Sequence, residues 1–85
     1  MEKFALPPEK FFYANDGSVI RSLHELPDAL RSMSSDTFSF HVNAQKNDFH
    51  SWVSGVFSHD RLARKIKSAS SKELMAKRVF MELFS

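Results

Sequence analysis

The chain has 85 residues, a formal net charge of +2 and a hydrophobic content of 42%. This length fits one small domain, and the apolar content suffices for one compact core, which excludes an intrinsically disordered chain. The absence of cysteine excludes a disulfide framework and a thiolate metal site, and it favours an intracellular protein.

Residues 1–8 predict an irregular arm, because Pro7 and Pro8 interrupt regular hydrogen bonding and keep the backbone before them extended. We expect residues 9–85 to form a single compact domain. Pro7, Pro8 and Glu9 also interrupt any signal-peptide core, and no apolar run approaches the roughly 20 residues that span a bilayer. These observations predict a cytoplasmic protein with no membrane partner.

A short β-hairpin is predicted next. The aromatic run 10–14 has the length of a strand, and Asp16-Gly17 separates it from the β-prone pair Val19-Ile20. Glycine tolerates the positive φ that tight hairpin turns require. Since a two-stranded hairpin is marginal alone in water, we expect it to pack against helices.

The first predicted helix begins with the S-x-x-E pattern of a capping box, formed by Ser22 and Glu25. Pro27 disturbs this helix, since a proline in the helix interior removes one backbone hydrogen bond. Either the helix kinks at Pro27, or residues 22–26 form a single turn and Pro27 opens the true helix as its first residue. The apolar residues at helical spacing are Leu23, Leu26, Leu30 and Met33.

Polar cap residues divide the rest of the chain into further short helices. Asn43 ends the first of these, because asparagine accepts the left-handed conformation found after many helices. The predicted starts are Ser34-Ser35-Asp36, Asn47, Ser58 or Asp60, and Ser70 or Ser71. The clearest apolar face, at i, i+3, i+4, i+7 and i+8, is Phe49, Trp52, Val53, Val56 and Phe57. The predicted fold class is mainly α (α+β), with four to five short helices around one core and a short N-terminal β-hairpin.

The connection before Asn47 carries a polar cluster that the apolar pattern does not require. A helix–loop–helix turn leaves free carbonyls at one helix end and free N–H groups at the other, and asparagine and aspartate satisfy such groups. His41 can donate a ring N–H across the turn. We interpret this corner as a structural latch, and the alternative is a binding site for a peptide or small ligand. The candidate residues are His41, Asn43, Asn47, Asp48 and Trp52.

No catalytic or cofactor-binding motif is present in the sequence. Gly17 and Gly55 alone cannot form a glycine-rich phosphate loop. His41, Asp48 and His50 carry metal-ligand atoms, but Asp48 and His50 are two residues apart and diverge on a helix. A general-base pair of His41 and Asp48 has no nucleophile at an informative spacing. We therefore expect a protein that is not an enzyme and that binds no metal or cofactor.

One extended pattern runs from the hairpin to the fourth predicted helix. Its motifs are Phe11-Phe12-Tyr13, Asp16-Gly17, Leu23-x-x-Leu26, Phe38-x-x-His41-Val42-Asn43, Asn47-Asp48-Phe49-x-x-Trp52-Val53 and Leu62-Ala63. The pattern resembles a family of small uncharacterised domains in prokaryotic, especially archaeal, proteins, both stand-alone and attached to larger chains. The resemblance covers roughly residues 11–80, and its central signature, 41–52, is its most specific part. It implies a self-contained module with a characteristic corner, and it implies no activity, substrate or cofactor.

Charge is unevenly distributed along the chain. Residues 1–59 carry five Lys and Arg against seven Asp and Glu, whereas residues 60–85 carry seven against three. One interpretation of the basic C-terminal segment is that Lys and Arg are favourable near the C-terminal ends of short helices. The alternative is that they form a surface that contacts nucleic-acid phosphates. Arg61, Arg64 and Lys65 share one predicted helix face. The candidate basic surface is Arg61, Arg64, Lys65, Lys67, Lys72, Lys77 and Arg78.

The phenylalanine content suggests a surface for a partner. Nine Phe residues exceed what a core of this size needs, and Phe38 and Phe40 are two apart on a short helix, so one of them should be partly exposed. Exposed apolar patches mark partner surfaces. We therefore predict a small non-enzymatic interaction or accessory module whose partner is another protein. The alternative is nucleic-acid binding through the basic C-terminal helices.

Overall fold

The computed structural model describes residues 6–84. Over this range, five α-helices follow a short antiparallel hairpin and two 3₁₀ turns, which confirms the predicted mainly α (α+β) class. The elements are η1 (Pro8–Lys10), β1 (Phe12–Tyr13), β2 (Val19–Ile20), η2 (Leu23–Glu25), α1 (Leu26–Ser32), α2 (Ser35–His41), α3 (Asp48–Phe57), α4 (Asp60–Lys67) and α5 (Lys72–Phe84).

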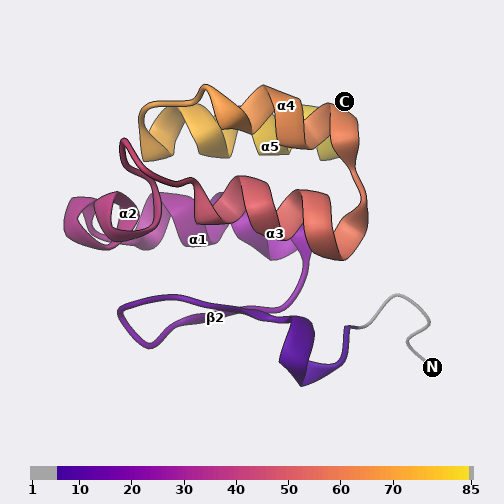
Figure 1. Cartoon of the computed structure of the whole chain (residues 1–85), viewed down its shortest axis with the longest axis horizontal. Helices are drawn as coiled ribbons and strands as arrows, with labels where there is room; N and C mark the ends of the chain where they lie inside the picture. The colour runs from indigo at the N-terminus through magenta and orange to yellow at the C-terminus, as the bar shows by residue number, and fades with distance from the viewer. Residues whose placement is uncertain (1–5, 85) are drawn as a thin grey trace.

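The elements form three levels in Figure 1. The hairpin lies below α1, α2 and α3, and α4 and α5 lie above them. Helix α1 packs on α5 and α3 packs on α4, while α4 and α5 also pack on each other. This arrangement encloses one core whose largest fully buried side chains are Phe49, Ile20, Leu26, Leu30, Leu62, Ile66, Met75, Val53 and Val79.

The N-terminal segment departs slightly from the predicted arm. Residues 1–5 of that arm lie outside the described residues. Pro8 is the first residue of η1, a position where proline is common because the missing N–H has no helical partner anyway. The Tyr13 hydroxyl donates a hydrogen bond to the Pro8 carbonyl at 2.6 Å, so η1 is fixed to the first strand.

The hairpin turn confirms the predicted role of Gly17. Phe12 lies opposite Ile20 in the hairpin. The Ala14 N–H donates to the Ser18 carbonyl, and the three residues 15–17 form the loop between them. Gly17 has φ +92°, and its N–H donates to the Ala14 carbonyl at 3.0 Å. A three-residue loop of this kind places its last residue in the left-handed region, which glycine enters without a steric cost.

The start of the first helix settles the two alternatives for Pro27. Residues 22–25 do not form the predicted capping box, because the Glu25 carboxylate accepts from the backbone N–H of Arg21, at 2.9 Å, and the Ser22 side chain makes no cap bond. They form the turn η2 instead, and α1 begins at Leu26 with Pro27 in its first turn. The helix does not kink, since first-turn N–H groups have no partner within the helix.

Most helix starts are as predicted. Helix α4 begins at Asp60, one of its two predicted starts, and its cap is His59, whose Nδ1 accepts from the Leu62 N–H at 3.2 Å. Ser58 instead ends α3 in the left-handed conformation, with φ 53°. The predicted caps that are confirmed, each by a side-chain oxygen that accepts a backbone N–H, are Ser34, Asn47 and Ser71. Among the described residues, no helix is both long and apolar enough to cross a membrane.

Candidate functional site

The predicted corner is the connection between α2 and α3. Asn43 and Lys46 exchange two backbone hydrogen bonds, of 2.9 and 3.3 Å, around a two-residue turn. Val42 and Asn47 form an isolated antiparallel bridge just outside it. This tight connection places the C-terminus of α2 beside the N-terminus of α3, so that side chains from both helix ends meet.

His41 lies at the centre of the corner and is only 5% exposed. Its Nδ1 is 2.9 Å from Oδ2 of Asp48, and its Nε2 is 2.9 Å from the backbone nitrogen of Asn15. Because a backbone N–H can only donate, Nε2 must be the unprotonated acceptor, and Nδ1 must carry the proton that Asp48 accepts. His41 therefore joins the hairpin turn to α3 as the neutral Nδ1–H tautomer.

Asp48, the first residue of α3, accepts two hydrogen bonds on one oxygen. The Lys46 ammonium lies 3.0 Å from the same Oδ2 that His41 contacts. Burial raises the pKa of Asp48, but the hydrogen bonds from His41 and Lys46 outweigh this effect and hold the pKa below its ordinary value. The carboxylate is therefore ionised at neutral pH, where the N-terminus of α3 also favours a negative charge.

Asn43 ends α2 in a different way from the prediction. Its Nδ2 donates to the carbonyls of Ser39 and Phe40, at 3.2 and 3.4 Å, and its Oδ1 accepts from the Gln45 N–H at 3.0 Å. The predicted left-handed backbone at Asn43 is wrong: among the described non-glycine residues, a positive φ is found at Ser58 and not at Asn43. The side chain satisfies the free carbonyls of the helix end directly.

Asn47 and Trp52 extend the corner to two further parts of the chain. Asn47 Oδ1 accepts the His50 N–H at 3.0 Å, and its Nδ2 donates to the Ile66 carbonyl at the end of α4, at 3.2 Å. Trp52 Nε1 donates to the Lys10 carbonyl of η1 at 2.8 Å. The candidate residues thus connect α2, α3, α4 and the N-terminal segment.

Phe12 of the hairpin lies against the aromatic side of this corner. Its ring centroid is 4.5 Å from that of Phe49, in a stacked arrangement. His41 and Trp52 meet the same ring edge-on, at 5.0 and 5.6 Å. Aromatic pairs at these distances add to the free energy of burial. The hairpin is therefore held by apolar contact and by the hydrogen bond between Asn15 and His41, while Trp52 bonds to η1 just before the hairpin.

The chemistry of the corner is that of a set of intramolecular hydrogen bonds. His41 and Asp48 have the spacing of a His–carboxylate pair, but the Nε2 lone pair already accepts from Asn15 and is not free to remove a proton from a substrate. Within residues 6–84, every buried side-chain nitrogen or oxygen has a hydrogen-bond partner, and no group of three His, Asp or Glu residues could hold a metal ion. The absence of enzymatic activity stays a prediction.

Sequence reasoning missed the groups that complete the corner. Lys10, Asn15 and Ile66 contribute backbone N–H or carbonyl groups, and because nearly every residue carries them they leave no signal in a sequence. Lys46 was detectable, since it is a cation two residues before an aspartate at a predicted helix start.

The seven residues of the predicted basic surface do not form one free surface. Arg61 Nε and Lys65 Nζ both lie beside Oε1 of Glu82 on α5, at 3.4 and 3.0 Å. The Lys65 ammonium, together with Arg61, holds the pKa of Glu82 below its ordinary value against the opposing effect of burial. Two of the three cations of the predicted α4 stripe therefore link α4 to α5.

Lys72 and Arg78 also make contacts within the fold. The Lys72 ammonium donates to the carbonyls of Arg31 and Met33 at the end of α1. Arg78 Nη1 donates to the Lys65 carbonyl at 2.7 Å and to Ser68 Oγ at 3.0 Å, at the end of α4. The remaining members are exposed and have no hydrogen-bond or ion-pair partner among residues 6–84: Arg64, Lys67 and Lys77.

A group of large apolar side chains is exposed on the last two turns of α5. Phe80, Met81 and Phe84 are 46%, 52% and 53% exposed. The Phe80 and Phe84 rings lie 4.8 Å apart, His24 meets Phe84 edge-on at 5.3 Å, and the Arg31 guanidinium lies 5.8 Å from the Phe80 ring. We call Phe80, Met81 and Phe84 the α5 patch.

No protein-family model, curated protein or solved structure matches the chain. The resemblance of the corner signature, residues 41–52, to a family of small prokaryotic domains stays a prediction.

Proposed function

We propose that this chain is a non-enzymatic protein-interaction module of the cytoplasm whose partner, another protein, binds at the α5 patch. The single observation that carries the proposal is the position of Phe80, Met81 and Phe84 on adjacent turns of one helix, each about half exposed. Large apolar side chains gathered on a surface favour association, because a partner removes their area from water.

The surroundings of the α5 patch support the same conclusion. Arg31 and His24 flank the two phenylalanine rings and supply polar groups at the edge of an apolar centre. Aromatic residues, methionine and arginine are enriched in protein interfaces, and aromatic anchors carry much of their binding energy. The cysteine-free sequence supports the cytoplasmic part of the proposal.

The test is retention of a protein from a lysate, compared between the wild type and the Phe80→Glu/Phe84→Glu variant. Both rings are half exposed, so the variant should keep the circular dichroism spectrum and melting temperature of the wild type. The Phe40→Gln variant is the matched control, because Phe40 is also half exposed but lies on α2.

A protein retained by the wild type and by Phe40→Gln, but lost in the double variant, is the expected result. Equal retention by the double variant would place the interaction elsewhere. A wild type that stays monomeric in light scattering across a concentration series and retains no protein would overturn the proposal.

The same preparation tests the alternative of nucleic-acid binding. A mixed-sequence DNA duplex is titrated at two salt concentrations, since contacts to phosphates make affinity fall steeply with salt. We expect weak binding, because Arg61, Lys65, Lys72 and Arg78 already have partners within the fold. Tight and steeply salt-dependent binding would favour a nucleic-acid partner over a protein.

A further inference from the structure

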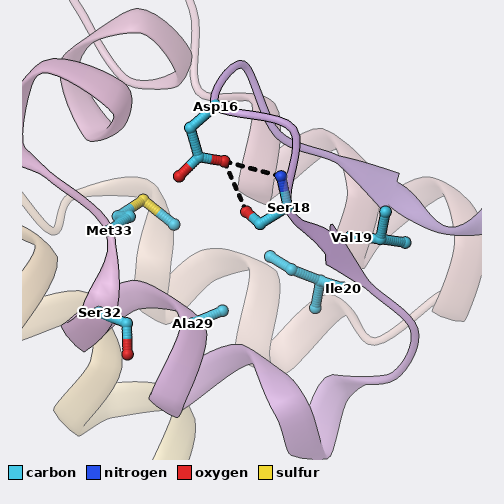
Figure 2. Close-up of a pocket in the computed structure, with 7 residues that line it drawn as sticks. All are labelled: Asp16, Ser18, Val19, Ile20, Ala29, Ser32 and Met33. Carbon is cyan, nitrogen blue, oxygen red and sulfur yellow. Dashed lines mark hydrogen bonds between the residues drawn. The ribbon is translucent and has the colours of Figure 1, made fainter.

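A small cavity lies between β2 and α1 (Figure 2). Its volume is about 120 Å³. Pockets for drug-sized ligands measure about 300–1,000 Å³, so this cavity is the size of a single side chain.

The cavity combines an apolar floor with one carboxylate. Ile20 and Met33, both buried, line it together with the Ala29 methyl group of α1. Asp16 of the hairpin turn lies at its edge, across from Ala29 and Met33 in Figure 2. A cavity of this kind suits a side chain that is apolar along its length and polar at its tip.

Asp16 is fixed in position by Ser18. Its Oδ1 accepts the Ser18 N–H at 2.9 Å and the Ser18 hydroxyl at 2.6 Å. The hydroxyl and the backbone N–H of Ser18 lower the pKa of Asp16, which keeps it ionised at neutral pH. The second carboxylate oxygen points away from Ser18 in Figure 2, and both hydrogen bonds from Ser18 go to Oδ1 instead.

We propose that this cavity binds one lysine side chain of a partner protein, with its methylene groups against Ile20, Ala29 and Met33 and its ammonium on the second carboxylate oxygen of Asp16. Lysine buries its aliphatic stem along apolar surfaces while its charged tip stays near water. The proposal goes beyond the α5 patch and does not depend on it, because the two surfaces share no residue.

Lysine fits this cavity better than arginine. A guanidinium group binds a carboxylate best with two parallel hydrogen bonds, one to each oxygen. Oδ1 of Asp16 already accepts two hydrogen bonds from Ser18, so one oxygen remains for a ligand. An ammonium group acts as a compact charge and needs only that oxygen.

The probe is the peptide acetyl-Gly-Lys-Gly-amide, titrated into the full chain while the methyl NMR signals of Ile20, Ala29 and Met33 are followed. We expect saturable shifts of these signals with a dissociation constant on the order of millimolar, because a single side chain buries little surface. The matched peptide with norleucine, which lacks the ammonium, should bind about two- to fivefold more weakly, as expected for one partly exposed ion pair. The arginine peptide should also bind more weakly.

Two variants separate the charge from the cavity. Asp16→Asn keeps an oxygen that accepts from Ser18 but removes the charge, so the lysine peptide should bind about two- to fivefold more weakly. Asp36→Asn removes an exposed carboxylate on α2 and should leave binding unchanged. Ala29→Leu fills the cavity from α1 and should abolish the methyl shifts even if Asp16→Asn fails to fold.

Several results would overturn the proposal. They are the absence of saturable shifts, equal binding of the norleucine peptide, tighter binding of the arginine peptide, or equal weakening by Asp36→Asn. The same methyl signals could also shift when the protein concentration is raised without any peptide, and this effect could be lost in Asp16→Asn. That result would overturn the proposed partner protein and identify a second copy of this chain as the source of the lysine.

Discussion

The two ring nitrogens of His41 connect parts of the chain that are far apart in sequence. In His41→Ala, the Asn15 N–H and the Asp48 carboxylate lose the partner they now share. Each lost hydrogen bond costs about 0.5–1.5 kcal/mol, because Asn15 is exposed and water can reach its N–H, and removal of the buried ring adds the cost of a cavity beside Phe12. We expect the free energy of unfolding to fall by about 2–4 kcal/mol and the melting temperature by roughly 4–8 °C per kcal/mol, measured in urea and thermal denaturation.

The control for this prediction is His50→Ala. His50 is half-buried on α3, and its ring makes no hydrogen bond to any described residue. Substitutions of this kind usually change stability by less than about 0.5 kcal/mol. If His41→Ala melted at the same temperature as His50→Ala, the latch interpretation would fail and the corner would become the first place to screen for a ligand.

Asp48 makes the stability of the fold depend on pH. A carboxylate whose pKa is lowered on folding stabilises the protein above its unfolded pKa, and this contribution is lost as the pH falls through the folded pKa. We expect the urea midpoint of the wild type to decrease below about pH 4. In Asp48→Asn, which can still accept from His41, part of this decrease should be missing, while Asp16 and Glu82 maintain the rest. Identical pH profiles would contradict an ionised Asp48 at the corner.

The residues of the corner show how far sequence reasoning reaches. Asn47 was predicted as a cap and is one, because capping needs only a side-chain oxygen and a local N–H. The partner of His41, the backbone of Asn15, lies 26 residues away and could not be predicted. Asn43 ends α2 as predicted but through its side chain, a choice that sequence pattern does not distinguish from a left-handed backbone.

Among the elements, the hairpin turn and α3 each contain one glycine. The backbone of the turn requires its glycine, whereas the helix would accept an alanine. Gly17 has φ +92°, which an L-residue enters only with strain, whereas Gly55 lies inside α3 with open space around its missing Cβ. Gly17→Ala should lower the free energy of unfolding by about 1–2 kcal/mol. Gly55→Ala should raise it by about 0.4–1 kcal/mol, because alanine favours the helix. Urea denaturation of both variants measures the pair, and stabilisation by Gly17→Ala would disprove the turn geometry.

Element boundaries were predicted well where a common cap residue starts a helix, and less well elsewhere. Ser34, Asn47 and Ser71 are frequent caps and were found from sequence. Asp60 was one of two predicted starts of α4 and is its first residue, but the cap itself is His59, a residue type that is not among the common caps. The start of α1 was left open because Pro27 fits both a kink and a first turn, and only the packed structure distinguishes the two.

For the molecule as a whole, the N-terminal segment is part of the same packed unit as the helices. The His41 and Trp52 rings both bond to its backbone, and the Phe12 ring packs against both of them and against Phe49. Basic residues of the second half also hold elements together, since Lys72 and Arg78 donate hydrogen bonds to carbonyls at the ends of α1 and α4. Side chains that looked like surface features in the sequence therefore link elements, and we expect the described residues to unfold in one cooperative transition.

Phe12 and Phe11 provide a matched pair for testing this cooperativity. Phe12 is buried against the rings of His41, Phe49 and Trp52. The adjacent Phe11 is only half-buried, and its ring lies beside the Arg21 guanidinium and the Tyr13 ring. Phe12→Ala should lower the free energy of unfolding by about 3–5 kcal/mol. This is a large share of the roughly 4–13 kcal/mol expected for a chain of this length. Phe11→Ala should cost about 1 kcal/mol or less.

The measurement is thermal unfolding followed at two wavelengths of circular dichroism. The far-ultraviolet signal reports the five helices, and the near-ultraviolet signal reports the Trp52 and Tyr13 environments beside the N-terminal segment. In Phe12→Ala both signals should shift together to a lower temperature, because the cavity opens inside one shared core. If the near-ultraviolet signal were lost while the helices melted at the wild-type temperature, the hairpin would be a separate appendage, and the role given to His41 as its anchor would be wrong.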